Sequence, residues 1–170
     1  LLPLLRRLDS NSKSINALIL SPTRELANQI NEEFMKLAPD TGLKSEVIYG
    51  GSSYDRQIRG VRRNRPQVII GTPGRVIDLV DKGILNFNET EYFVLDEADE
   101  MLNMGFLEDV QRLMTELPSE KKIWMFSATM PRAIKNLVKK EFNEPEVVQI
   151  EKKAMTAESI EQMAFGVKRK

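Results

Sequence analysis

The stretch Tyr92-Phe93-Val94-Leu95-Asp96-Glu97-Ala98-Asp99 places three carboxylates directly after an uninterrupted apolar run. A continuous run of this kind is typical of a strand buried on both faces of a parallel sheet. Carboxylates at its end are costly to desolvate unless a cation compensates them, and oxygen ligands suit a hard cation such as Mg²⁺. Open α/β sheets bind their ligands at the carboxyl ends of strands. The stretch therefore predicts an α/β fold with a site at this edge, and a solvated acidic strand end is the alternative.

Short apolar runs alternate with amphipathic stretches along the chain, as in strand–helix units on a parallel sheet. Helices are predicted at 26–37, at 53–64, from Thr72-Pro73 onward, at 102–117 and from Met130-Pro131 onward. The predicted fold is therefore a doubly wound parallel sheet with helices on both faces. Six strands are predicted, at 17–20, 46–49, 68–70, 92–95, 123–126 and 147–150.

The composition excludes several classes of site. The 170 residues suit one globular domain and contain no cysteine and no histidine, which excludes a Cys/His zinc site and a histidine-based triad. Lysine plus arginine and aspartate plus glutamate both total 25, so any nucleic-acid binding must be local. No apolar stretch approaches the roughly 20 residues that a membrane span needs, and we expect a cytoplasmic protein.

Other motifs also follow predicted strands. Ser21-Pro22-Thr23-Arg24 and Thr72-Pro73-Gly74-Arg75 each open a helix, and Gly50-Gly51 follows a strand. A helix N-terminus offers free N–H groups to a phosphate, an arginine adds charge, and glycine permits close backbone approach. Taken alone, Thr23 could simply cap its helix and the two glycines could form a plain turn.

These motifs, the carboxylate box and Ser127-Ala128-Thr129 occur in an order that resembles the DEAD-box RNA helicases, specifically their first RecA-like domain. The stretch 95–106 is similar to the bacterial cold-shock and translation-initiation branches of that family. The resemblance covers essentially the whole chain. It implies an ATP-dependent RNA helicase that couples ATP hydrolysis to local duplex separation or to RNA–protein remodelling, with ATP and Mg²⁺ as cofactors.

The resemblance also implies a role for each site residue. Asp96 would hold Mg²⁺ through water, and Glu97 would position and deprotonate the water that attacks the γ-phosphate. Asp99 would bond to the hydroxyls of Ser127 and Thr129, which on local grounds alone could be helix caps before Pro131. RNA would be bound along its sugar-phosphate backbone, without sequence preference. The residues implied in this contact are Pro22, Thr23, Arg24, Gly50, Gly51, Thr72, Gly74 and Arg75.

By the same resemblance, residues 1–150 would be a partial RecA-like domain that lacks its P-loop strand. Residues 151–170 would be a linker and the start of a second RecA-like domain, the partner of the first. A P-loop needs Gly-Lys-[Ser/Thr], and none of the 9 glycines is followed by lysine. We expect the P-loop and the adenine-reading Gln motif upstream of Leu1, so that the isolated chain would be nearly inactive as an ATPase.

The missing strand would lie between 123–126 and 147–150. Three outcomes are predicted: these two strands pair directly, another chain fills the gap, or the protein contains further residues upstream. Unpaired sheet edges of this kind are normally avoided.

Two other functional classes stay open, a non-enzymatic fragment that binds RNA or a regulator, and a DNA translocase of the same superfamily. The predicted helix at 53–64 also carries a run of arginines opposite a buried face of Tyr54, Ile58 and Val61. The favoured interpretation of this run is a solvated face paired with scattered acids. The arginines are Arg56, Arg59, Arg62, Arg63 and Arg65.

Overall fold

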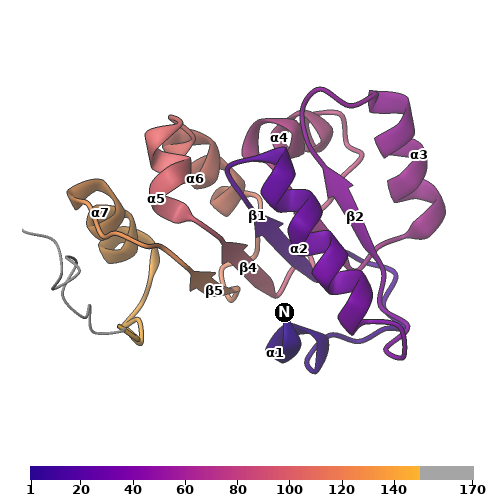
Figure 1. Cartoon of the computed structure of the whole chain (residues 1–170), viewed down its shortest axis with the longest axis horizontal. Helices are drawn as coiled ribbons and strands as arrows, with labels where there is room; N and C mark the ends of the chain where they lie inside the picture. The colour runs from indigo at the N-terminus through magenta and orange to yellow at the C-terminus, as the bar shows by residue number, and fades with distance from the viewer. Residues whose placement is uncertain (150–170) are drawn as a thin grey trace, which may run out of the picture.

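A computed structural model, which describes residues 1–149, shows a five-stranded parallel sheet with helices on both faces (Figure 1). The strand order across the sheet is β2-β3-β1-β4-β5, and every neighbouring pair is parallel. The strands are β1 Ala17–Leu20, β2 Ser45–Ile48, β3 Val68–Gly71, β4 Tyr92–Leu95 and β5 Lys122–Met125. The helices are α1 Leu2–Leu5, α2 Arg24–Leu37, α3 Tyr54–Asn64, α4 Pro73–Asp81, α5 Ala98–Asn103, α6 Leu107–Thr115 and α7 Arg132–Glu141. The predicted α/β class is confirmed, and five of the six predicted strands agree to within one residue at each end.

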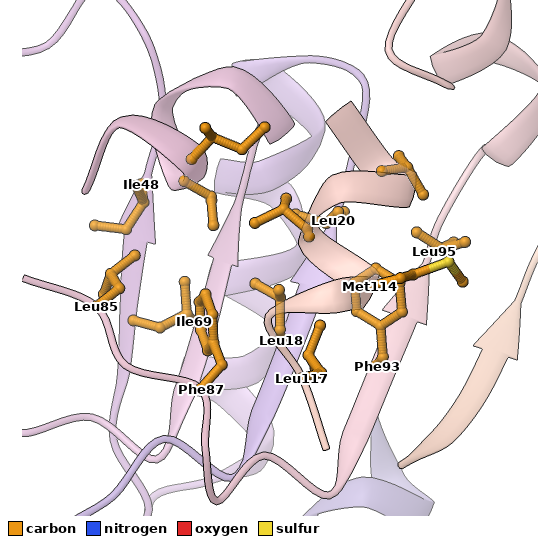
Figure 2. Packing of buried hydrophobic residues seen from close by; sticks show 14 of the residues in the cluster. Leu18, Leu20, Ile48, Ile69, Leu85, Phe87, Phe93, Leu95, Met114 and Leu117 are labelled. Carbon is orange, nitrogen blue, oxygen red and sulfur yellow. The ribbon is translucent and has the colours of Figure 1, made fainter. Parts of the chain in front are cut away.

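Alternate residues of the strands supply two cores, one on each face of the sheet. The larger core lies under α3 to α7, and Figure 2 shows Leu18, Ile69 and Phe93 from three neighbouring strands packed within it. The smaller core lies under α1 and α2, where Phe34 of α2 packs against the opposite faces of the same strands. Fully burying a side chain of this size is worth roughly 1.5–3 kcal/mol, so the continuous apolar runs explain why helices cover both faces.

The predicted helix at 102–117 is wrong, because the chain forms two helices there. α5 ends at Asn103 and α6 begins at Leu107. Between them Gly105 has a φ of +84°, a left-handed conformation that stops a helix and suits a residue without a side chain. The Phe106 N–H donates to the Met101 carbonyl, which closes the end of α5 (2.9 Å). The apolar spacing continues through the break, since both helices pack on one core.

The predicted strand at 147–150 is also wrong for the residues that can be described. Residues 145–149 form no strand, and Val147 and Val148 are 69% and 87% exposed. Ile150 and the predicted linker at 151–170 lie outside the described residues. The prediction that this segment pairs directly with β5 therefore fails, and among residues 1–149 nothing pairs with the outer edge of β5. The polar Gln149 interrupts the short apolar run, and the two valines before it pack on neither core.

Within residues 1–149, no helix is both long and apolar enough to cross a membrane.

Candidate functional site at the carboxyl edge of the sheet

All five motifs follow strands of one parallel sheet, so they lie along the same edge (Figure 1). The strand order places the Gly50-Gly51 turn after β2 at one end and Ser127-Ala128-Thr129 after β5 at the other. The motifs that open α4 and α2 follow β3 and β1, and the carboxylate box follows β4. The edge therefore has two halves. One carries the glycines and arginines, and the other carries the carboxylates and hydroxyls.

The carboxylate box begins as a continuation of β4. The Asp96 N–H donates to the Leu20 carbonyl of β1 at 2.9 Å, which extends the ladder by one residue. Glu97 then adopts a left-handed conformation, with φ and ψ both 52°, and α5 starts at the next residue. Such a conformation costs roughly 1–3 kcal/mol for a residue with a side chain, and it concentrates at functional sites. The sharp turn leaves the Glu97 side chain exposed at the edge.

Asp96 is half-buried, and desolvation raises the pKa of its carboxyl above the ordinary value. Its Oδ1 accepts from the Glu97 N–H (3.1 Å), and no ion pair among residues 1–149 includes it. A half-buried carboxylate that forms no ion pair suits a metal ion. No group of three acidic side chains gathers among the described residues, so an ion here would take its other ligands from water or a phosphate. That donor set fits Mg²⁺, which keeps several waters.

Asp99 connects the carboxylate box to the loop after β5, as the resemblance implies. Its Oδ2 accepts from the Thr129 hydroxyl at 2.6 Å and from the Thr129 N–H at 2.9 Å. The Asp99 N–H donates to the Ser127 hydroxyl oxygen (3.2 Å), and the Ser127 hydroxyl donates to the Thr129 carbonyl (2.7 Å). The Thr129 hydroxyl is the main cause of a lowered Asp99 pKa. Neither hydroxyl caps α7, whose N-cap is Pro131, so the helix-cap alternative is wrong.

The start of α2, at the middle of the edge, exposes an arginine. The Thr23 hydroxyl accepts from the Leu26 N–H (3.2 Å) and caps the helix, while Pro22 is buried. The Arg24 side chain is 62% exposed and pairs with its neighbour Glu25. Its Nη1 lies 3.8 Å from the position a Cβ on Gly51 would occupy, so Arg24 and the glycine turn are side by side although they follow different strands.

The glycine turn leaves its backbone open. Gly50 and Gly51 are both exposed, and Gly51 has a φ of +81°, which a residue with a side chain rarely adopts. A Cβ at Gly50 would contact nothing within 4 Å. At the start of α4, Thr72 and Gly74 are half-buried, and Thr72 is the N-cap without a side-chain cap bond.

Arg75 differs from Arg24 in that its guanidinium faces the protein. Its side chain is 10% exposed, and Nη1 donates to the Ser52 carbonyl (2.9 Å) and to Gln57 Oε1 (3.1 Å). Gln57 Nε2 in turn donates to the Tyr49 carbonyl at 3.0 Å. The guanidinium also stacks on the Tyr54 ring, 3.8 Å from its centre. Arg75 and Gln57 together hold the residues on both sides of the glycine turn.

The sequence reasoning did not identify Gln57. In the sequence, Gln57 stands out only as the one amide on the inward-facing side of α3, the side that also carries the buried Val61. A buried amide is normally hydrogen-bonded, so its position next to a glycine turn could have indicated the partner.

Comparison with known proteins agrees with this geometry. The model of the DEAD/DEAH box helicase family matches residues 1–137. The ATP-dependent RNA helicase CshA of Listeria monocytogenes is 44% identical over 169 residues, which cover 99% of this chain and 32% of that protein. CshA of Bacillus subtilis is 42% identical over 98% of this chain and 33% of its own length. The chain thus spans about a third of the length of these relatives.

A crystal structure of a DEAD box protein from Methanococcus jannaschii superposes with a TM-score of 0.77 at 44% identity. The match covers 84% of this chain and 38% of that one. The crystal structure of a hypothetical ATP-dependent RNA helicase from Sulfolobus tokodaii gives a TM-score of 0.75 at 33% identity, over 85% of this chain and 41% of that one. With a family model that spans most of its length, the chain belongs to the DEAD/DEAH box helicase family.

Proposed function

We propose that this chain is the part of an ATP-dependent RNA helicase that positions the hydrolytic water and one stretch of RNA backbone. The whole protein would couple ATP hydrolysis to local duplex separation or to remodelling of RNA–protein complexes. The observation that carries the proposal is the pair of bonds from Thr129 to Asp99, because it ties the carboxylate box to the loop of the next strand.

The carboxylates have separate tasks. When bound, Mg²⁺ and ATP supply the phosphoryl group and the charge neutralisation that phosphoryl transfer needs. Asp96, which is half-buried and forms no ion pair among residues 1–149, would hold the ion through water. Glu97 sits on the exposed turn beside it, where it can orient a water molecule and accept its proton. The Asp99 carboxylate already accepts a hydrogen bond from the Thr129 hydroxyl, so its role would be to couple the carboxylate box to the loop after β5.

The other half of the edge would bind RNA. The backbone track consists of Pro22-Thr23-Arg24, Gly50-Gly51 and Thr72-Pro73-Gly74-Arg75. Its support is the open backbone of the glycine turn and the exposed Arg24 beside it. Backbone amides and one arginine recognise phosphates and sugars, so binding would be independent of sequence. Thr23 and Arg75, whose polar groups are engaged within the protein, would contribute by shaping the track.

Two further points belong to this proposal. The second RecA-like domain of the same protein would close over the edge from the side of Ser127-Ala128-Thr129, and the protein would act in the cytoplasm. A DNA translocase with the same carboxylate box is distinguished by the polymer that stimulates it, so ATP hydrolysis by the full-length protein should respond to RNA and not to DNA.

The decisive variant is Glu97→Gln in the full-length protein. It should nearly abolish ATP hydrolysis while ATP and RNA still bind, because the amide keeps the shape and loses the base. Glu100→Gln is a matched control, since Glu100 is exposed in the helix that Glu97 precedes, and among residues 1–149 its side chain hydrogen-bonds only to Asn103. Equal losses of nucleotide binding and hydrolysis in Glu97→Gln would make Glu97 a structural residue and refute its role as base.

A further inference from the structure

One face of α3 is covered by exposed arginines. At 100° per residue, positions 56, 59, 62 and 63 fall within about a third of the helix circumference. Asp55 in the first turn is the only acidic residue of the helix. The arginine face is defined as Arg56, Arg59, Arg62 and Arg63, all of which are exposed.

The expectation that scattered acids pair with these arginines is wrong within residues 1–149. None of the ion pairs there includes an arginine of α3. The nearest carboxylate on β2, that of Glu46, instead accepts from Asn64 (2.9 Å) and lies against Gly60. Like charges one helical turn apart repel by a few tenths of a kcal/mol per pair. The helix therefore carries a concentrated positive charge that no ion pair among residues 1–149 neutralises.

The opposite side of α3 is fixed to the sheet. Val61 is buried in the larger core, and Tyr54 and Ile58 pack against it. At Gly60 the helix faces the Glu46 carboxylate of β2, which a Cβ there would meet. The arginine face is thus presented on a rigid support.

The arginine face continues the backbone track. The glycine turn follows β2, which is the edge strand of the sheet, and α3 starts three residues after Gly51 (Figure 1). A polymer that crosses the ends of β1, β3 and β2 next meets α3. Arg56 and Arg63 are about 10 Å apart along the helix axis at 1.5 Å per residue, so the face is long enough for extended contact.

We propose that the arginine face of α3 binds the phosphates of the RNA strand where it leaves the backbone track past Gly51. This inference rests on the proposed function and extends its RNA site by one helix. The guanidinium fork suits phosphate, which it can bind with two parallel hydrogen bonds. A protein partner fits less well, because interface cores need apolar anchors and α3 exposes no large apolar side chain.

The test compares two RNAs and two double variants of the full-length protein. One single strand has about 6 nucleotides, within the span of the track, and the other is extended at both ends to about 20. Arg59→Gln with Arg62→Gln removes two charges from the arginine face. Lys135→Gln with Lys139→Gln is the matched control, because both lysines are exposed on α7, beyond the opposite end of the sheet.

The arginine variant should bind the long RNA about fivefold less tightly per lost arginine at roughly 0.1 M salt. The slope of log binding constant against log salt concentration should become shallower by about 0.7 per lost contact. The short RNA should bind as before, and the lysine variant should match the unaltered protein with both RNAs. The inference is refuted if the arginine variant binds the long RNA normally, or if the lysine variant loses as much affinity for it. Either result leaves the backbone track standing. Failure of the unaltered protein to bind the short RNA overturns the backbone track, and the inference with it.

Discussion

Replacing Arg75 by methionine should destabilise the chain, because the change keeps most of the aliphatic stem and removes the guanidinium. The Ser52 carbonyl and the Gln57 side chain, which is buried, would each lose a charged donor. A buried acceptor left without a donor costs roughly 1–3 kcal/mol, and the stacking on the Tyr54 ring adds roughly 0.5–1 kcal/mol. Because Ser52 and Tyr54 can recover some hydration, we expect a loss of about 2–4 kcal/mol from a stability of roughly 5–15 kcal/mol.

Urea unfolding measures this loss. The only tryptophan, Trp124, is half-buried on β5 with its ring 5.5 Å from that of Tyr92, so its fluorescence reports global unfolding far from the substitution. With a slope of roughly 2 kcal/mol per molar urea, the unfolding midpoint should fall by about 1–2 M. Arg24→Met is the matched control. Its side chain is exposed and pairs only with Glu25, so the change should stay within about 0.5 kcal/mol.

The same pair of variants separates two ways of contributing to RNA binding. Arg24→Met should weaken RNA binding by the full-length protein without loss of stability, with a smaller salt slope. Arg75→Met should weaken it through a loosened glycine turn, together with the loss of stability. If Arg75→Met unfolds at the same urea concentration as Arg24→Met, the guanidinium does not hold the turn and this reasoning is refuted.

Three further experiments test other parts of the edge. Gly71→Ala should cost roughly 1–3 kcal/mol because its Cβ would collide with a backbone carbonyl of β2, whereas Gly50→Ala, with open space, should unfold almost as the unaltered chain. Asp96→Asn should raise the thermal midpoint at pH 7, since burial disfavours the charged carboxylate, and this gain should vanish below about pH 4, where both the folded and unfolded states hold the proton. A midpoint at pH 7 that falls instead would mean that the charge is compensated. In the full-length protein, Ser127→Ala with Thr129→Ala should impair duplex separation more than ATP turnover, and equal losses would exclude a coupling role.

The sheet could be predicted from the sequence because its strands are short, continuous apolar runs. A run such as 92–95 has no polar face, so it must be central, and the motif after it must lie at the carboxyl edge. The contact between Asp99 and Thr129 could be predicted only through the family resemblance. Nothing local to either residue indicates a partner 30 positions away in the chain.

Other features depend on tertiary context that sequence periodicity does not contain. The break at Gly105 is invisible to apolar spacing, because α5 and α6 pack on the same core. The different surroundings of Arg24 and Arg75 are also hidden, although both follow a strand and open a helix. Arg75 lies beside α3 and donates to the side chain of the buried Gln57 in that helix. Arg24 does not lie beside such an acceptor, and its guanidinium stays exposed.

The two halves of the edge are held together by the sheet rather than by side chains. The Asp96 N–H bonds to the end of β1, four residues before Arg24, yet within residues 1–149 no side-chain hydrogen bond joins the carboxylates of the box to an arginine of the track. A change at the carboxylate side chains therefore has only the backbone of the sheet, and no side-chain hydrogen bond, through which to reach the RNA half. The bond that can pass it on is the one from Asp99 to Thr129, which leads away from the track toward β5. We therefore propose that coupling between hydrolysis and RNA runs mainly through the second RecA-like domain, which would close over the edge from the side of Ser127-Ala128-Thr129.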